Sequence, residues 1–281
     1  GFTDHTWLQA ESVQPPCDKL ESQRNPNIRV METIRPVNIS EPEKGTYILD
    51  MGQNMVGWVS MKVKGKKGEQ VSLRFAEVLK EDGLLYMDNI RGAIVTDTYT
   101  LKGTGEESWE PSFVYHGFRY VEIKGFPGIP TVNDFEGKVV YDEMEVTGHF
   151  ETSDPLINRI YNNAYWGIRG NCRGMQTDCP RRDERMGWLG DRAAGSHGER
   201  FVFENHHLYV KWLDDIEQTQ LENGSLSDVA PAYWAFYGDN MTWPAAYLII
   251  SNMIYVQYGD RPPIIKHYYS KQKWMSYQRN P

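Results

Sequence analysis

The chain has 281 residues, and 30 Lys and Arg stand against 38 Asp and Glu, which gives a formal net charge of −8. A nucleic-acid-binding protein needs a basic surface that releases counterions, so this balance excludes that class and we expect no nucleic-acid partner. Hydrophobic residues make up 40% of the chain without a run long enough to span a bilayer, which predicts a soluble globular protein with no membrane partner.

Residues 1–45 are polar and rich in proline, as in Pro15-Pro16 and Glu41-Pro42. This composition predicts a linker, or the tail of an upstream domain. The chain begins at Gly1 without Met, a basic segment or an apolar segment, which is typical of a mature or shortened chain. Its start does not fix the compartment, and our expectation is the periplasm or the extracellular space rather than the cytoplasm.

Residues 46–150 show apolar and polar side chains in alternation. The alternation is clearest in two runs: Val59, Met61 and Val63, and then Val71, Leu73 and Phe75. A period of two is typical of strands with one buried face, and glycine-containing turns interrupt the pattern at short intervals. The segment is therefore predicted to form an antiparallel, jelly-roll-like β-sandwich.

The period changes at Asp154-Pro155, where Asp154 suits a helix N-cap and Pro155 the first helical position. Apolar residues then recur every three or four positions up to Ile168, and again in residues 208–216 and 244–258. Residues 151–281 are therefore predicted to form a helical domain, joined to the sandwich near residue 150.

The densest chemistry lies in residues 178–191, DCPRRDERMGWLGD, which hold four carboxylates, three arginines and one tryptophan. Proline and glycine within the run predict a loop that connects two helices. Crowded carboxylates can differ in pKa, so that one stays protonated as a general acid. Trp188 beside Asp178 and Asp191 suits a sugar, which needs an aromatic platform and hydroxyl acceptors. The alternative is an ion-paired surface loop, but a solvated run of charges does not explain the tryptophan.

The run DCPRRDERMGWLGD resembles the signature of the bacterial α-L-rhamnosidases of glycoside hydrolase family 78. Residues 50–58, 75–79 and 115–120 are similar to the same family. The resemblance implies a β-sandwich that precedes a six-hairpin (α/α)6 barrel, without a cofactor. It also implies inverting hydrolysis of terminal, non-reducing α-L-rhamnose from glycosides or polysaccharides.

Carried over position by position, the resemblance implies that Glu184 is the general acid, that Asp178 and Asp191 bind rhamnose and that Trp188 forms the wall of the pocket. Arg182 and Asp183 match family positions as well, and we expect them at the sugar. The family's general base lies in later barrel helices. The chain is therefore expected to hold the N-terminal part of the barrel, to lack the base and to be inactive by itself.

Two other functions fit the sequence: a non-catalytic carbohydrate-binding or scaffold fragment, and another (α/α)6-barrel glycosidase or lyase. Three cysteines without a metal-binding spacing indicate no metal site. The sequence gives no indication of the oligomeric state.

Several further residues have alternative interpretations. Residues 228–231 and 237–239 resemble a second family stretch near the sugar pocket, although a plain loop explains them as well. Trp234 and Trp243 suit either an extended sugar platform or the core. We expect His116 in the core, and His206-His207 in the middle of a helix without a catalytic role. Three sandwich residues could bind carbohydrate but are expected at the domain interface: Gln53, Asn54 and Trp58.

Overall fold

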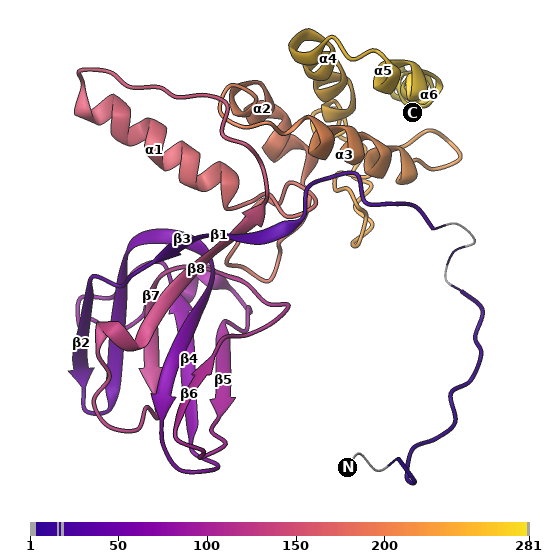
Figure 1. The fold of residues 1–281 in the computed structure, drawn as a ribbon. Coiled ribbons are helices and arrows are strands. Elements are labelled where there is room, and N and C mark those ends of the chain that lie inside the picture. Colours follow the sequence, from indigo (N-terminus) through magenta and orange to yellow (C-terminus); the bar gives the residue numbers. More distant parts are fainter. Residues whose placement is uncertain (1–3, 16, 18–19, 280–281) are drawn as a thin grey trace.

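A curled antiparallel sheet is followed by a helical region in the computed structural model, which describes residues 4–15, 17 and 20–279 (Figure 1). The eight strands are β1 (Ile28–Ile34), β2 (Asn38–Glu43), β3 (Thr46–Lys64), β4 (Gln70–Ala76), β5 (Thr96–Thr100), β6 (Glu106–Trp109), β7 (His116–Lys124) and β8 (Phe135–Asp142). Two 3-10 turns, η1 (Asp88–Ile90) and η2 (Val132–Asp134), lie in the connections.

The long strand β3 makes the sheet curl. Its first part pairs with β2 and β7, and its second part pairs with β6 and β8. Gly57 pairs with both β7 and β8, and a Cβ there would lie 1.8 Å from the carbonyl oxygen of Lys138, so only glycine fits. The alternating side chains of both parts meet in one core, which includes Leu49, Val59 and Phe118. The predicted sandwich-like fold class is confirmed.

The predicted linker over residues 1–45 is wrong for residues 28–43, which form β1 and β2. β1 pairs with β8 from Ile28 opposite Asp142 to Ile34 opposite Gly137. The side chains of β1 are exposed or half-buried, and Met31 and Ile34 pack against the edge of the core, so main-chain hydrogen bonds to β8 hold most of this strand. In β2, the register shifts between Ser40 and Glu43, around Pro42, which has no N–H to donate.

The helices are α1 (Pro155–Arg169), α2 (Leu189–Glu199), α3 (His206–Gln218), α4 (Ala246–Tyr258), α5 (Pro262–Lys266) and α6 (Tyr268–Arg279). Asp154 caps α1 as predicted, since its side chain accepts a hydrogen bond from Leu156 N at 2.8 Å. Gly259 ends α4 at φ 66°. His206 begins α3 instead of lying mid-helix. Within the described residues, the helices are too short or too polar to cross a membrane.

Helix α1 is tied to the sheet through the buried side chain of Arg169. Its guanidinium pairs with both carboxylate oxygens of Glu32 on β1, at 2.6 and 3.2 Å. The same group lies over the rings of Trp166, Tyr165 and Tyr141, at 3.6, 4.7 and 5.2 Å from their centroids. The sheet and the helical region therefore share a charged contact, and its cation is surrounded by aromatic rings.

Candidate active site

Residues 178–188 of the acidic, arginine-rich run lie in the loop between α1 and α2, as predicted, and residues 189–191 begin α2. The loop is closed by two bonds from the main chain: Asp178 N donates to Met186 O, and Met186 N donates to Asp178 Oδ1 at 2.7 Å. The amide of Ala230 donates to Gly187 O, so residues 228–230 lie against the loop. A Cβ at Gly187 would be 2.1 Å from Ala230 O, so a residue with a side chain does not fit at this position.

Glu184 is the centre of the contacts in this loop. Its Oε1 accepts a hydrogen bond from Trp188 Nε1 at 2.9 Å, and its Oε2 lies 2.8 Å from Arg91 Nη1. Arg182 Nη1 is 4.0 Å from the same oxygen. The carboxylate is 16% exposed, so it is reachable from solvent while held by three side chains. Arg91 directly follows η1 in the sandwich, and sequence reasoning missed it.

Trp188 begins a row of aromatic rings. It stacks on Phe236 with ring centroids 5.2 Å apart and planes inclined by 28°, and Trp234 meets Phe236 edge-on at 5.9 Å. Phe236 and Trp234 remain partly exposed, so Trp234 belongs to an exposed row of aromatic rings and not to the core. Trp243 packs against the helical core instead, and a Cβ at Gly190 would lie 2.5 Å from its ring.

Asp191 lies in the first turn of α2 and Asp178 at the start of the loop. Partial burial raises the pKa of Asp191, and the carboxylates of Asp178 and Glu184 raise it further. Burial likewise raises the pKa of Asp228, which accepts a hydrogen bond from Asn240 Nδ2 at 2.7 Å. Several carboxyl groups therefore share one region and differ in their environments, which is typical of acid–base sites.

The remaining charged residues of the loop point toward the sandwich. Arg182 Nε donates to Asn89 O at 3.4 Å, and Asp183 is exposed near Gly92. Arg185 does not pair with Glu184, since its guanidinium donates to Tyr115 O and Arg182 O. Five predicted site residues are thus brought together, whereas Asp183 lies at the rim; the five are Asp178, Arg182, Glu184, Trp188 and Asp191.

The ligand atoms of Asp178, Cys179 and Glu184 lie within 4.8 Å of one another, which is close enough for a cation. Burial raises the pKa of the Cys179 thiol, and this opposes the thiolate that a metal requires. We therefore assign no metal to the group.

Other predicted residues have structural partners. His116 is buried and lies 3.0 Å from Asp97, and His206 pairs with Asp260 at 2.9 Å. Gln53 and Asn54 line a pocket between the sheet and α1, as expected for an interface. The expectation is wrong for Trp58, which donates to Glu110 within the sandwich at 3.0 Å.

Comparison with known proteins identifies both parts of the chain. Residues 40–141 match the model of the bacterial α-L-rhamnosidase concanavalin-like domain, and residues 145–280 match that of the bacterial α-L-rhamnosidase six-hairpin glycosidase domain. An α-L-rhamnosidase of Streptomyces avermitilis is 39% identical over 99% of this chain, and one of Formosa agariphila is 34% identical over 99%. The chain spans 27% and 30% of these two relatives.

Solved structures agree with these matches. The α-L-rhamnosidase of Dictyoglumus thermophilum superimposes with a TM-score of 0.95 at 45% identity, over 98% of this chain and 31% of that one. The S. avermitilis α-L-rhamnosidase in complex with L-rhamnose gives a TM-score of 0.86 at 40% identity, over 91% of this chain and 25% of that one. The chain therefore belongs to the bacterial α-L-rhamnosidases of glycoside hydrolase family 78.

Proposed function

We propose that this chain supplies the general acid and part of the sugar pocket of an inverting α-L-rhamnosidase. The observation that carries the proposal is the 2.9 Å contact between Glu184 and the indole of Trp188, which is stacked on Phe236. The carboxyl group that we assign as the proton donor thus lies at the edge of an aromatic platform. This is the arrangement needed to protonate the bridging oxygen of a sugar that rests on the rings.

The substrate class follows from the chemistry of the cluster. L-Rhamnose is uncharged and carries a methyl group, so one face can pack on Trp188, Phe236 and Trp234 while its hydroxyl groups donate to carboxylates. Asp178 and Asp191 are assigned as the acceptors. We assign Arg182 and Asp183 to the rim of the pocket, where a glycoside or polysaccharide would continue.

In the reaction, Glu184 gives its proton to the glycosidic oxygen as the bond from that oxygen to the anomeric carbon breaks. Water attacks the opposite face and is activated by a second carboxylate, which inverting enzymes hold roughly 6.5–9.5 Å from the acid. We assign the acid and no base. Because glycosides and polysaccharides are encountered outside the cytoplasm, we propose a periplasmic or extracellular location, which cell fractionation would test.

The acid role is tested with aryl α-L-rhamnosides and the product of the full open reading frame. In Glu184→Gln, kcat/KM for a phenyl rhamnoside should fall by about 10²–10⁴, because this leaving group needs a proton. Dinitrophenolate leaves without a proton, so kcat/KM for a dinitrophenyl rhamnoside should fall far less. The matched control is Glu222→Gln, an exposed carboxylate of the same region. Equal losses on both substrates would contradict the assignment.

Sugar binding is tested on the 281-residue chain. L-Rhamnose should shift the indole N–H resonance of Trp188 in a proton–nitrogen NMR spectrum, and L-mannose, which has a hydroxymethyl group in place of the methyl, should bind more weakly. Binding without hydrolysis by the full reading frame would favour a carbohydrate-binding module over an enzyme.

A further inference from the structure

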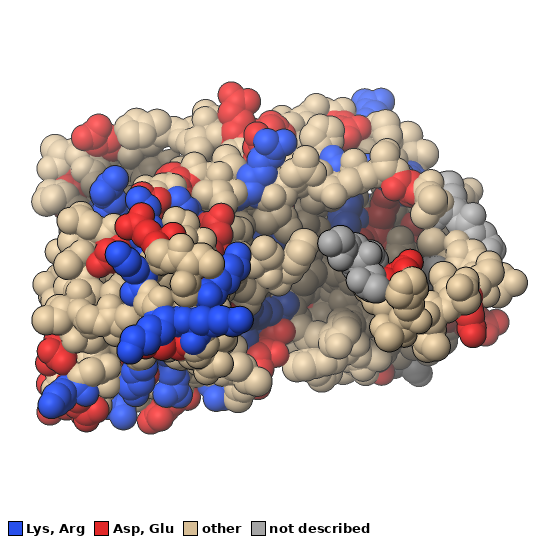
Figure 2. All heavy atoms as spheres, turned by 60° about the horizontal axis from the view of Figure 1, so that its bottom comes forward, with Lys and Arg blue, Asp and Glu red and all other residues tan. Residues whose placement is uncertain are grey.

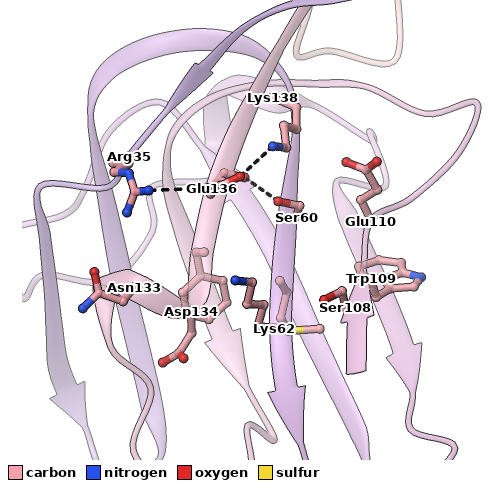
Figure 3. A pocket seen from close by; sticks show the side chains of 12 residues that line it. Arg35, Ser60, Lys62, Ser108, Trp109, Glu110, Asn133, Asp134, Glu136 and Lys138 are labelled. Atoms are coloured by element: carbon pink, nitrogen blue, oxygen red, sulfur yellow. Dashed lines mark hydrogen bonds and ion pairs between the residues drawn. The ribbon is translucent and has the colours of Figure 1, made fainter. Parts of the chain in front are cut away.

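The sandwich carries a groove that the proposed hydrolysis does not use. It has a volume of about 370 Å³ and lies over β3, β6 and β8 (Figure 3). Its sides are formed by side chains that alternate with the core positions of these strands: Ser60 and Lys62 of β3, Ser108 of β6, and Glu136 and Lys138 of β8. All of its lining residues lie between positions 35 and 138, so the groove is separate from the Glu184 loop.

The carboxylates around the groove already have partners. Glu136 accepts a hydrogen bond from Lys138 Nζ at 2.7 Å. Asp134 accepts from the main-chain N–H and the hydroxyl of Thr131, at 2.7 and 2.8 Å. Glu110 accepts from the indole of Trp58, outside the lining residues. Each of these carboxylates therefore already has at least one donor that partly satisfies its charge.

Two donors around the groove have no hydrogen-bond partner in the described part of the chain, and Arg35 has only a long ion pair. Lys62 and Asn133 form no side-chain hydrogen bond or ion pair with the residues that the structure describes. Arg35 is 77% exposed and comes only to 3.9 Å from Glu136. Trp109 is half-buried at the edge, where stacking on Tyr99 at 5.1 Å holds its ring. Cationic and amide donors beside a fixed aromatic ring suit a ligand with an anionic group and a C–H face.

We propose that this groove is a second, non-catalytic site for an acidic sugar, with a uronate carboxylate between Lys62 and Arg35 and the pyranose ring against Trp109. Figure 2 shows that Lys and Arg gather on the sandwich side of the face in view, with carboxylates among them. Because the chain as a whole carries a net charge of −8, general attraction cannot hold a polyanion, and binding requires this local arrangement.

The experiment measures the mobility of the full chain in native gels that contain polygalacturonate or the same polymer fully methyl-esterified. The first polymer should retard the protein and the second should not, because esterification removes the carboxylate. Lys62→Met should weaken binding about tenfold, the loss of one charge-assisted hydrogen bond. Lys64→Met is the matched control, since Lys64 lies two residues further along β3, outside the lining of the groove. It should change binding by less than about twofold.

Two further arms complete the test. Polyglutamate should bind much more weakly than polygalacturonate, because it offers carboxylates without a sugar ring for Trp109. Glu184→Gln should bind polygalacturonate as the wild type does, so that failure of this proposal is distinguishable from failure of the hydrolase assignment. Equal retardation by polyglutamate, equal effects of Lys62→Met and Lys64→Met, or no retardation at all would overturn the site.

Discussion

Replacing Arg169 by methionine tests the contact that joins the helical region to the sheet. Methionine keeps much of the apolar stem but removes the charge and both hydrogen bonds to Glu32. Because Glu32 is 42% exposed, water can hydrate the carboxylate that is left behind. The variant therefore isolates the guanidinium without leaving an unpaired charge in the core.

The expected loss follows from the surroundings of the guanidinium. Hydrogen bonds between charged partners contribute about 1.5–3 kcal/mol, and a cation over an aromatic ring contributes about 0.5–2 kcal/mol. The 3.6 Å distance from Arg169 to the Trp166 centroid favours the upper part of that range. Burial of the cation costs several kcal/mol in the native protein, and this cost disappears in the variant. We expect a net loss of about 2 kcal/mol in the free energy of unfolding.

The assay is urea unfolding of the full chain, followed by circular dichroism and tryptophan fluorescence. Arg159→Met is the matched control, because Arg159 is exposed on the same helix, and it should cost less than about 0.5 kcal/mol. The double variant with Glu32→Gln should show a coupling of about 1 kcal/mol. A variant as stable as the wild type, or a control that loses as much, would refute the reasoning.

Three further outcomes are expected. Burial raises the pKa of Asp142 to about 6, so the folded protein binds the extra proton between pH 4 and 6 and loses up to about 3 kcal/mol of stability as the pH rises through this window. Asp142→Asn should remove that slope in urea unfolding at several pH values; an unchanged slope would contradict the assignment. Burial lowers the pKa of Lys271 to about 8, so stability should instead rise from pH 8 to about 10.5, and Lys271→Met should abolish the rise. Gly187→Ala should separate the site loop from Ala230, lower the free energy of unfolding by about 1–3 kcal/mol and weaken L-rhamnose binding, whereas Gly198→Ala, where a Cβ meets nothing within 4 Å, should have none of these effects.

Local patterns were sufficient to predict much of the fold. The alternation in β3 and β4 reflects side chains that point in turn to the core and to solvent. Asp154 and Gly259 act at helix ends through their own hydrogen bonds and backbone angles, so neighbouring residues suffice to identify them. The composition of residues 178–191 likewise predicted the loop and a site with Asp178, Trp188 and Asp191, whereas Glu184 and Arg182 were expected there from the resemblance to family 78.

Features that depend on distant partners were missed. β1 has no fully buried side chain, and its hydrogen bonds run to β8, more than one hundred positions away. Helix α2 contains three glycines, and the prediction gave no bounds for it. Packing of Leu189 and Ala193 in the helical core outweighs that weak propensity, and the buried Glu199 is paired with Arg192 at 2.7 Å. Arg91 belongs to a turn whose sequence gives no sign that it reaches Glu184.

The ion pair between Arg91 and Glu184 limits how sandwich and helical domains from different family members can be combined in one protein. A chimaera that takes its sandwich from one parent and its helices from another would bring together two loops that were selected with different partners. Exchanges that keep η1 with its following arginine and the 178–188 loop from the same parent should preserve the orientation of the Glu184 side chain. Crossovers at the boundary between the domains alone should fold and yet turn over poorly.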